Sequence, residues 1–307
     1  VAAGSEESNA LVQLETGGRT LANQQATKIP LYDGLVAESV NCWPSPDYDA
    51  MSILGLFHRL MPAGFYYKTF MWPRFAWKYY EHFIRHAAGL SHAPSEPDPD
   101  SYDKMNAHCD VLVVGTGPAG LAAALAAGRT GARVIIADEQ IEAGGALLAE
   151  RRLIDDKPGL DWVAECVAEL EALAEVRILQ KTTAFGYYDH NFVGLLEQRG
   201  KNLPDGDGGT RQRMWRVRAK QVVLATGALE RPLIFSDNDR PGVMLAGAVR
   251  AYINRYAEAP GKRVCVFTNN DDAYRTALDL HDAGVVVPAI IDLRGDPLGA
   301  LPTEAID

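Results

Sequence analysis

Apolar runs and alanine-rich segments alternate through the middle of the chain in the order strand, helix, strand. Residues 111–114 and 134–137 are short apolar runs, which predict buried strands. The alanine-rich segment between them has helical character and ends at Gly131. Apolar residues return at helical spacing after Pro158, and residues 176–179 predict a third strand. This alternation predicts an α/β fold with a doubly wound, Rossmann-like parallel sheet.

The next segment alternates between polar and apolar residues. Residues 183–199 and 214–220 predict antiparallel strands around an exposed turn at residues 201–209. Residues 222–227 predict a buried strand that ends in small side chains. From residue 260 the first pattern returns, with a strand, a helix and a strand predicted over residues 263–268, 271–283 and 285–292. The sequence therefore predicts a second, incomplete α/β domain.

The N-terminal part of the chain has a different character. Residues 1–42 are polar and rich in turn formers, which predicts short strands and extended coil. Residues 43–89 are crowded with aromatic side chains, and Phe75, Tyr79 and Phe83 recur there at helical spacing. This aromatic surface exceeds what one small helix can bury, so we expect a domain or subunit interface.

Composition and charge limit the classes of partner that the chain can have. Of the 307 residues 47% are hydrophobic, and no apolar run reaches the length needed to span a bilayer, so we expect a soluble chain. Thirty Lys and Arg against 40 Asp and Glu give a net charge of −10. This balance argues against nucleic acid or an anionic membrane as the main partner, even though basic residues lie among the aromatic ones.

Cysteine and histidine residues indicate neither disulfides nor a metal site. The four cysteines are Cys42, Cys109, Cys166 and Cys265. They form no CxxC pair, and three lie in apolar strand or helix patterns, which predicts buried thiols in a reducing cytoplasm. His82 and His86 stand one helical turn apart, yet no third ligand is evident, so we expect no metal there.

The candidate chemistry follows the first predicted strand, where residues 115–120 read GTGPAG. The spacing GxGxxG at the start of a helix is typical of loops that bind dinucleotides. Gly115 permits the tight turn, Gly117 has no Cβ to hold a diphosphate away from the backbone, and Gly120 lets helix and strand pack closely. The helix N-terminus then faces the phosphates.

Further candidate contacts follow at the expected distance. The second strand ends on Asp138 and Glu139, about 20 residues after the glycines, where a carboxylate binds ribose hydroxyls and repels a 2′-phosphate. NAD or FAD is therefore favoured over NADP. Gly144 and Gly145 can let backbone approach a cofactor, and residues 225–227 (ATG) end a strand in small side chains, a weak motif when taken alone.

The order of these signals matters because a GxGxxG loop alone arises by chance. Strand, glycines, helix, second strand and acid occur at the expected spacing, which favours a nucleotide site over an empty doubly wound unit. The repeated unit differs, since its loop at residues 268–273 has no glycine and carries two carboxylates where phosphates would lie. We expect no dinucleotide in that second unit.

These signals predict three segments. An N-terminal arm for packing or subunit contact covers residues 1–103 and ends in a linker rich in proline and aspartate. A first dinucleotide-binding domain of NAD or FAD type covers residues 104–258, and residues 259–307 begin a second, truncated domain. The chain opens at Val1 without a methionine or a leader pattern, which favours an internal piece or a processed product.

Several stretches resemble a known group of flavoproteins. Residues 112–124 (LVVGTGPAGLAAA), the pair at Gly144, residues 225–232 (ATGALERP) and residues 238–248 (NDRPGVMLAGA) resemble flavoproteins with two dinucleotide domains. The arm is more specific. Residues 10–17 (ALVQLETG), 29–45 (IPLYDGLVAESVNCWPS), 62–73 (PAGFYYKTFMWP), 84–90 (IRHAAGL) and 96–104 (EPDPDSYDK) resemble the alpha subunits of heterotetrameric sarcosine oxidases. The resemblance covers essentially the whole chain and marks it as a middle fragment.

This resemblance implies cofactors and partners that spacing does not show. In that family the alpha subunit holds NAD in its first dinucleotide site, and the beta subunit carries FAD, where sarcosine is oxidised. FMN linked to a beta-subunit histidine lies at the alpha–beta interface and passes electrons to oxygen. The products are glycine, hydrogen peroxide and formaldehyde, or methylenetetrahydrofolate where the folate domain is supplied. Gamma and delta subunits complete the complex, and we expect no catalytic residue in this chain.

The resemblance and the spacing together assign one set of cofactor contacts: Gly115, Gly117, Pro118, Ala119, Gly120, Asp138, Glu139, Gly144, Gly145, Thr226 and Gly227. Two alternatives remain open. The chain could belong to a reductase-type relative, such as a hydrogen cyanide synthase or NADH oxidase subunit, with FAD in the first site. It could also be a scaffold in which a bound nucleotide stabilises the fold without redox work.

Overall fold

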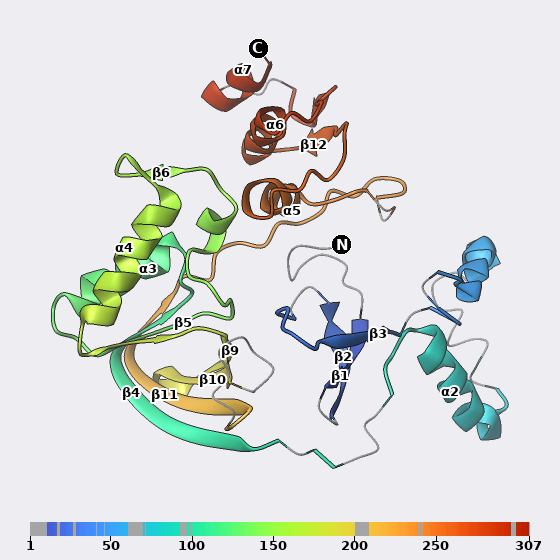
Figure 1. Ribbon diagram of the computed structural model, residues 1–307, viewed down its shortest axis with the longest axis horizontal. Coiled ribbons are helices and arrows are strands. Elements are labelled where there is room, and N and C mark those ends of the chain that lie inside the picture. The colour runs from blue at the N-terminus through green and yellow to red at the C-terminus, as the bar shows by residue number, and fades with distance from the viewer. Residues whose placement is uncertain are drawn as a thin grey trace. The chain divides into compact units, whose positions relative to one another are not determined.

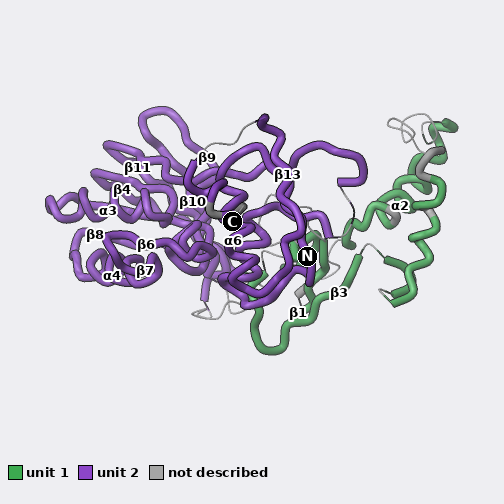
Figure 2. The backbone as a smooth tube through the Cα atoms, turned by 90° about the horizontal axis from the view of Figure 1, so that it is seen from above, with its two compact units in different colours: residues 1–100, 201–206 green, residues 101–200, 207–307 purple. Residues whose placement is uncertain are grey.

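The chain folds into two compact units in a computed structural model, which describes residues 11–306 except 17–18, 27–28, 41, 46, 61–69, 71, 93–96, 99, 200–208, 239, 241 and 296–298. One unit comprises residues 1–100 and 201–206, and the other residues 101–200 and 207–307 (Figure 2). Among the described residues, no helix combines the length and the apolar character needed to cross a bilayer.

A six-stranded mixed sheet forms the centre of the larger unit, in the order β8-β5-β4-β11-β10-β9. Its strands are β4 (Tyr102–Val114), β5 (Val134–Ala137), β8 (Val176–Leu179), β9 (Thr182–Tyr188), β10 (Phe192–Gln198) and β11 (Gln212–Leu224). The first four strands of that order run parallel, and β9 and β10 run antiparallel to their neighbours. The predicted α/β class with a parallel sheet is thereby confirmed.

Side chains that alternate along the strands fill two cores. On one face, Val113 and Ile136 pack with the helices α3 (Pro118–Gly128) and α4 (Gly159–Ala172), which lie side by side in Figure 1. On the other face, Leu112 and Ile135 pack with Leu195 of β10 and Trp215 of β11. Both faces of β4 are therefore buried at its carboxyl end, which fixes where the following loop begins.

The antiparallel region differs from the prediction. Residues 183–199 form two strands, because the chain turns at η5 (Asp189–Asn191), where His190 and Asn191 have φ angles of 58° and 52°. Residues 222–224 continue β11 instead of forming a separate strand, and Leu224 is 63% exposed, so the predicted burial is wrong at that position. The predicted turn at residues 201–209 lies almost wholly outside the described residues.

Smaller elements complete this unit. They are η4 (Gly145–Leu148), β6 (Leu153–Ile154), β7 (Lys157–Pro158), α5 (Ala246–Arg250), the π-helix η6 (Ala251–Arg255), β12 (Val266–Thr268), α6 (Asp272–Asp282), β13 (Ile290–Asp292) and α7 (Ala300–Ile306). Both β12 and β13 are shorter than predicted, because Arg263 and Val286 make only an isolated bridge. Cys109 and Cys166 are buried as expected, whereas Cys265, just before β12, is exposed.

The smaller unit contains a three-stranded antiparallel sheet and a helical segment. The strands β1 (Leu11–Thr16), β2 (Arg19–Gln25) and β3 (Val36–Ser39) lie in the order β2-β1-β3. The helical segment contains η2 (Ala50–Leu60), η3 (Arg74–Ala76) and α2 (Trp77–Ala87).

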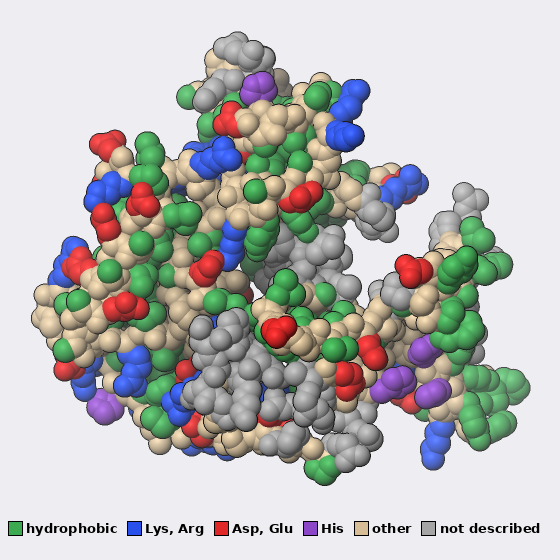
Figure 3. Space-filling model, in the orientation of Figure 1, with side chains coloured by type: hydrophobic (Ala, Val, Ile, Leu, Met, Phe, Trp, Pro, Cys, Tyr) green, Lys and Arg blue, Asp and Glu red, His purple; other side chains and the backbone are tan. Residues whose placement is uncertain are grey.

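The predicted aromatic face of this helical segment is exposed, with 83% of Phe75, 78% of Tyr79 and 60% of Phe83 accessible. Figure 3 shows hydrophobic side chains gathered over α2. The aromatic residues at positions 65–67 lie outside the described residues.

Candidate dinucleotide site

The residues predicted to contact the cofactor lie where three parallel strands end. Val114 of β4 is paired with Ala137 of β5 on one side and with Leu224 of β11 on the other, so these carboxyl ends meet at one edge of the sheet. The glycine loop follows β4, the two carboxylates follow β5, and Thr226 and Gly227 follow β11. The crevice outside such strand ends is the usual ligand position in open α/β sheets.

Two glycines of the loop are required by the fold itself. Gly115 has a φ of 107°, and a Cβ on it would overlap the carbonyl oxygen of Ala225. A Cβ on Gly120 would overlap the carbonyl oxygen of Gly115. These positions bring the loop, α3 and the end of β11 into direct backbone contact, as the spacing predicts.

Gly117 differs because no protein atom crowds it. Its φ of −68° and ψ of 178° suit any residue, and the nearest atom to an added Cβ, apart from the two adjacent residues, would be the Cα of Gly145 at 3.9 Å. Gly117 is the N-cap of α3, and it has no side chain with which to cap the first turn of that helix. The loop therefore leaves bare backbone at a helix N-terminus, where unpaired N–H groups attract phosphate.

The second glycine pair packs against this loop. The N–H of Gly144 donates to the carbonyl oxygen of Thr116 at 2.9 Å. Gly145 has a φ of 54°, and a Cβ on it would come within 2.8 Å of the Cα of Gly117. The structure thus joins the two glycine segments into one surface of backbone atoms.

The two predicted ribose carboxylates have different surroundings. Oδ2 of Asp138 accepts hydrogen bonds from the N–H of Thr116 at 2.6 Å and from its hydroxyl at 2.8 Å, and Oδ1 accepts from the N–H of Gln140 at 2.8 Å. Glu139 is exposed and makes no hydrogen bond through its side chain within the part of the chain that the structure describes. Sequence spacing alone does not distinguish the two acids.

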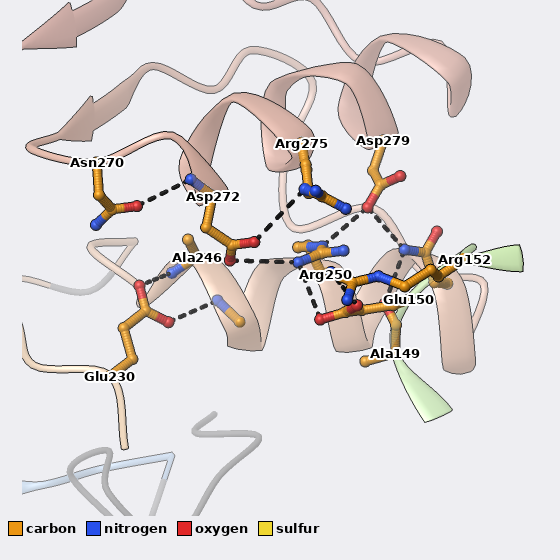
Figure 4. Close-up of polar contacts among 12 residues, drawn as sticks. Ala149, Glu150, Arg152, Glu230, Ala246, Arg250, Asn270, Asp272, Arg275 and Asp279 are labelled. Carbon is orange, nitrogen blue, oxygen red and sulfur yellow. Dashed lines mark hydrogen bonds and ion pairs between the residues drawn. The ribbon is translucent and has the colours of Figure 1, made fainter. Parts of the chain in front are cut away.

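Thr226 and Gly227 lie beside the loop through Ala225. The N–H of Ala225 donates to the carbonyl oxygen of Val114 at 2.8 Å, and both following residues are exposed. The ATGALERP stretch at residues 225–232 also contains Glu230. Its carboxylate accepts hydrogen bonds from the N–H groups of Ala246 at 2.9 Å and Gly247 at 2.7 Å (Figure 4). This carboxylate caps the start of α5, a role that the motif did not reveal.

A second polar cluster was missed by sequence reasoning. Arg250 is 5% exposed and pairs with Asp279 at 3.0 Å, Asp272 at 3.4 Å and Glu150 at 3.5 Å (Figure 4). Asn254 donates to the carbonyl oxygen of Ala149 at 2.9 Å. The cluster ties α5 and η6 to the segment after the second glycine pair, and no local pattern marks a helical arginine as buried.

In the repeated strand–helix–strand segment after residue 260, the loop between strand and helix is occupied by side chains of the same segment. Arg294 pairs with Asp271 at 2.8 Å and with Asp292 at 2.7 Å, and the hydroxyl of Tyr274 donates to Asp292 at 3.0 Å. The hydrogen bond from Arg294 holds the pKa of Asp292 well below its usual range, so this carboxylate stays charged. That this unit binds no dinucleotide stays a prediction, and these contacts support it.

Comparison with known proteins finds a family model that matches part of the chain, and similar proteins. Residues 110–192 match the family model of the FAD dependent oxidoreductases. The chain is 51% identical over 294 residues to the sarcosine oxidase subunit alpha of Rhizobium meliloti (strain 1021), which covers 95% of this chain and 30% of that protein. It is 49% identical over 221 residues to the subunit alpha of Corynebacterium sp. (strain P-1), which covers 71% of this chain and 23% of that protein.

A solved structure shares the fold. The L-proline dehydrogenase of P. horikoshii superposes with a TM-score of 0.51 at 24% sequence identity, over 67% of this chain and 39% of that one. The predicted resemblance to sarcosine oxidase alpha subunits, and with it to subunits of oxidoreductases, is confirmed by the first two relatives. The chain spans less than a third of the length of each of them.

Proposed function

We propose that this chain, a homologue of one segment of the sarcosine oxidase alpha subunits, is the dinucleotide-binding part of such a subunit in a flavin-dependent amine oxidase. One observation carries the proposal. The loop at residues 115–120, the pair Gly144 and Gly145, and the strand end at Thr226 and Gly227 converge on bare backbone at the start of α3. Bare backbone at a helix N-terminus is where such folds bind the diphosphate of a dinucleotide.

The residues present suit a dinucleotide. We assign Gly115, Gly117, Pro118, Ala119 and Gly120 to the diphosphate, Asp138 and Glu139 to the ribose side, and Gly144, Gly145, Thr226 and Gly227 to the border of the site. A bound nicotinamide or flavin would supply the capacity to take up electrons. The chain's own groups bind and orient the nucleotide, and we assign no catalytic residue to them.

NAD is the nucleotide that we propose for this site. The acid at the end of β5 favours NAD or FAD over NADP, and the likeness to the alpha subunits favours NAD. FAD is the second candidate, because the matching family is named for FAD and its match includes the whole glycine loop. That candidate corresponds to a reductase-type subunit.

The chemistry is proposed to lie on a partner. By the resemblance, the beta subunit would carry FAD and demethylate sarcosine to glycine, with FMN at the alpha–beta interface and O2 reduced to hydrogen peroxide. Gamma and delta subunits would complete this cytoplasmic complex. The exposed aromatic residues Phe75, Tyr79 and Phe83 support a subunit contact for the arm, since large rings in water are typical of surfaces that become buried.

Cofactor analysis of the intact complex tests the proposal. The subunits are separated under mild denaturation, and the nucleotides that leave with each are identified by mass spectrometry. We expect NAD from the alpha chain and flavins from the beta side. FAD from the alpha chain would support the second candidate, and an alpha chain that carries no dinucleotide would contradict the proposed site.

A further inference from the structure

We infer that Arg250 and Asn254 are positioning residues for the dinucleotide, because they hold the second glycine pair in place from the side opposite to the diphosphate loop. The glycine pair belongs to residues 142–152, the strap, which lie between that loop and the helices α5 and η6. The inference rests on the proposed nucleotide site. It makes the affinity for a nucleotide depend on two helices that contribute none of the assigned contacts.

One side of the strap forms part of the binding surface. The N–H of Gly144 donates to the carbonyl oxygen of Thr116 at 2.9 Å. A Cβ added to Gly145 would come within 2.8 Å of the Cα of Gly117, so the two backbone segments touch where the diphosphate is proposed to lie. A shift of the strap would therefore change the surface that the ligand meets.

Backbone hydrogen bonds join the glycine pair to the other end of the strap. The N–H of Leu147 donates to the carbonyl oxygen of Gly144 at 3.1 Å, and the N–H of Ala149 donates to that of Ala146 at 3.0 Å. Leu147 is buried in the core that α3 and α4 cover. A displacement at Ala149 or Glu150 is therefore passed through closed turns to Gly144.

Two side chains from α5 and η6 contact this end of the strap (Figure 4). Nη1 of Arg250 lies 3.5 Å from Oε1 of Glu150, and Nδ2 of Asn254 donates to the carbonyl oxygen of Ala149 at 2.9 Å. Oδ2 of Asp279 in α6 also accepts from Nε of Arg250 at 3.0 Å and from Nδ2 of Asn254 at 2.9 Å. Because Arg250 is buried, water screens these charges less than it screens a surface pair.

The π-turn of η6 brings a third side chain to the strap. The N–H of Tyr256 donates to the carbonyl oxygen of Ala251 at 3.2 Å, five residues earlier, and single π-turns occur frequently at functional sites. Nη2 of Arg255 pairs with Oε2 of Glu142 at 2.5 Å, before the glycine pair, whereas the contacts with α5 lie after it. The two helices thus hold the strap on both sides of its glycines.

This arrangement couples the binding surface to α5 and η6. If the dinucleotide requires the strap in place, its binding must in turn stabilise the contacts between the strap and the helices, since a coupling free energy is reciprocal. A cluster that only stabilised the fold would leave the affinity for a nucleotide unchanged. Affinity and stability therefore distinguish the two roles.

The test measures ADP-ribose binding by calorimetry on the full-length subunit in its complex, freed of bound nucleotide. Asn254→Ala removes the donor to the strap, and Glu150→Gln removes the strap's charge while Arg250 keeps its pairing with Asp279. We expect each variant to bind ADP-ribose about fivefold more weakly, the equivalent of one hydrogen bond. The double variant should bind more weakly than either single variant.

Hydrogen exchange on the same complex measures the coupling in the other direction. ADP-ribose should slow exchange of the Tyr256 amide in η6 about fivefold, even though that amide lies outside the assigned contacts. In the Asn254→Ala, Glu150→Gln double variant, saturating ADP-ribose should no longer slow exchange at Tyr256.

Asp103 offers a matched control. Its carboxylate pairs with Nη2 of Arg213 at 2.8 Å, at the amino-terminal end of β4 and away from the strap. Asp103→Asn should reduce stability in urea unfolding and leave the affinity for ADP-ribose unchanged.

Two results would overturn the inference: wild-type affinity in the double variant, or exchange at Tyr256 that ADP-ribose does not slow in the wild type. A wild-type complex that does not bind ADP-ribose would contradict the proposed function instead. The free protein then still tests the positioning, because the Gly144 amide should exchange faster in the double variant than in the wild type. Equal rates at Gly144 would show that the helices do not hold the strap.

Discussion

Gly117→Ala separates the nucleotide site from the fold. The backbone at Gly117 has φ −68° and ψ 178°, and the nearest atom to the new Cβ, apart from the two adjacent residues, would be the Cα of Gly145 at 3.9 Å. Replacing glycine at a compatible position stabilises a protein by about 0.4–1 kcal/mol. Alanine is a poorer N-cap than glycine, which offsets part of this gain. We therefore expect the free energy of unfolding to stay within about 1 kcal/mol of the wild type.

The same methyl group would occupy the space in which the diphosphate approaches the backbone. Holding the phosphates away from the first turn of α3 would lengthen hydrogen bonds that each contribute about 1.5–3 kcal/mol when one partner is charged. Loss of one such bond corresponds to about 10- to 150-fold weaker binding, since 1.4 kcal/mol is a factor of ten.

Calorimetric titration with ADP-ribose and urea unfolding, on the same preparations, measure the two effects separately. Gly261→Ala is the matched control, because its added Cβ would meet no atom closer than the Cγ2 of Val264, at 4.0 Å, apart from the two adjacent residues. Gly261 also lies outside the converging segments. Gly120→Ala marks the opposite case, since its Cβ would overlap the carbonyl oxygen of Gly115 and should cost about 3 kcal/mol of stability. Wild-type affinity in Gly117→Ala would refute the assignment of this loop to the diphosphate.

Three further predictions follow from the contacts. Hydrogen bonds, chiefly from Arg133, hold the pKa of Asp110 below its usual range, so its contribution to stability is present at neutral pH and is lost as the pH falls below about 3.9. The destabilisation in Asp110→Asn, measured by urea unfolding, should therefore shrink between pH 7 and pH 3. Arg250→Met leaves the partly buried carboxylates of Glu150 and Asp279 without their cation and should cost about 3 kcal/mol, whereas Arg129→Met breaks an exposed pair and should cost under about 1 kcal/mol in the same assay. Phe75→Ser should leave the melting temperature unchanged and weaken assembly with partner subunits in analytical ultracentrifugation, and an unchanged assembly would argue against the arm as an interface.

The buried parallel strands were predictable from local pattern. The strands at 134–137 and 176–179 have the bounds that their apolar runs predict, and α4 begins directly after Pro158. Elements buried on both faces leave continuous apolar runs, which the sequence displays without reference to any partner. The glycine spacing likewise predicted the start of α3, because the close backbone contacts at Gly115 and Gly120 leave no room for a Cβ.

Errors arose where burial or turning depends on distant parts of the chain. The turn at Asp189–Asn191 contains neither glycine nor proline, and its only local signal is an aspartate and an asparagine, which favour turns and which the predicted strand over residues 183–199 left out of account. Leu224 and Cys265 lie in apolar runs and yet are exposed. An apolar run shows what a segment can bury, and only the neighbouring elements determine whether it does.

The sequence by itself determined the fold class, the position of the glycine loop after β4, and the resemblance to an oxidase subunit. Tertiary structure decided the contacts within the candidate site. Asp138 and Glu139 are adjacent in sequence, but only the pairing of β4 with β5 brings Thr116 to one of them, across 22 residues. Arg250 is buried only because Glu150, 100 residues earlier, and α6 close around it. The spacing of residues along the chain determines which backbone groups come into contact in the glycine loop. The partner of a side chain depends on which elements fold against each other.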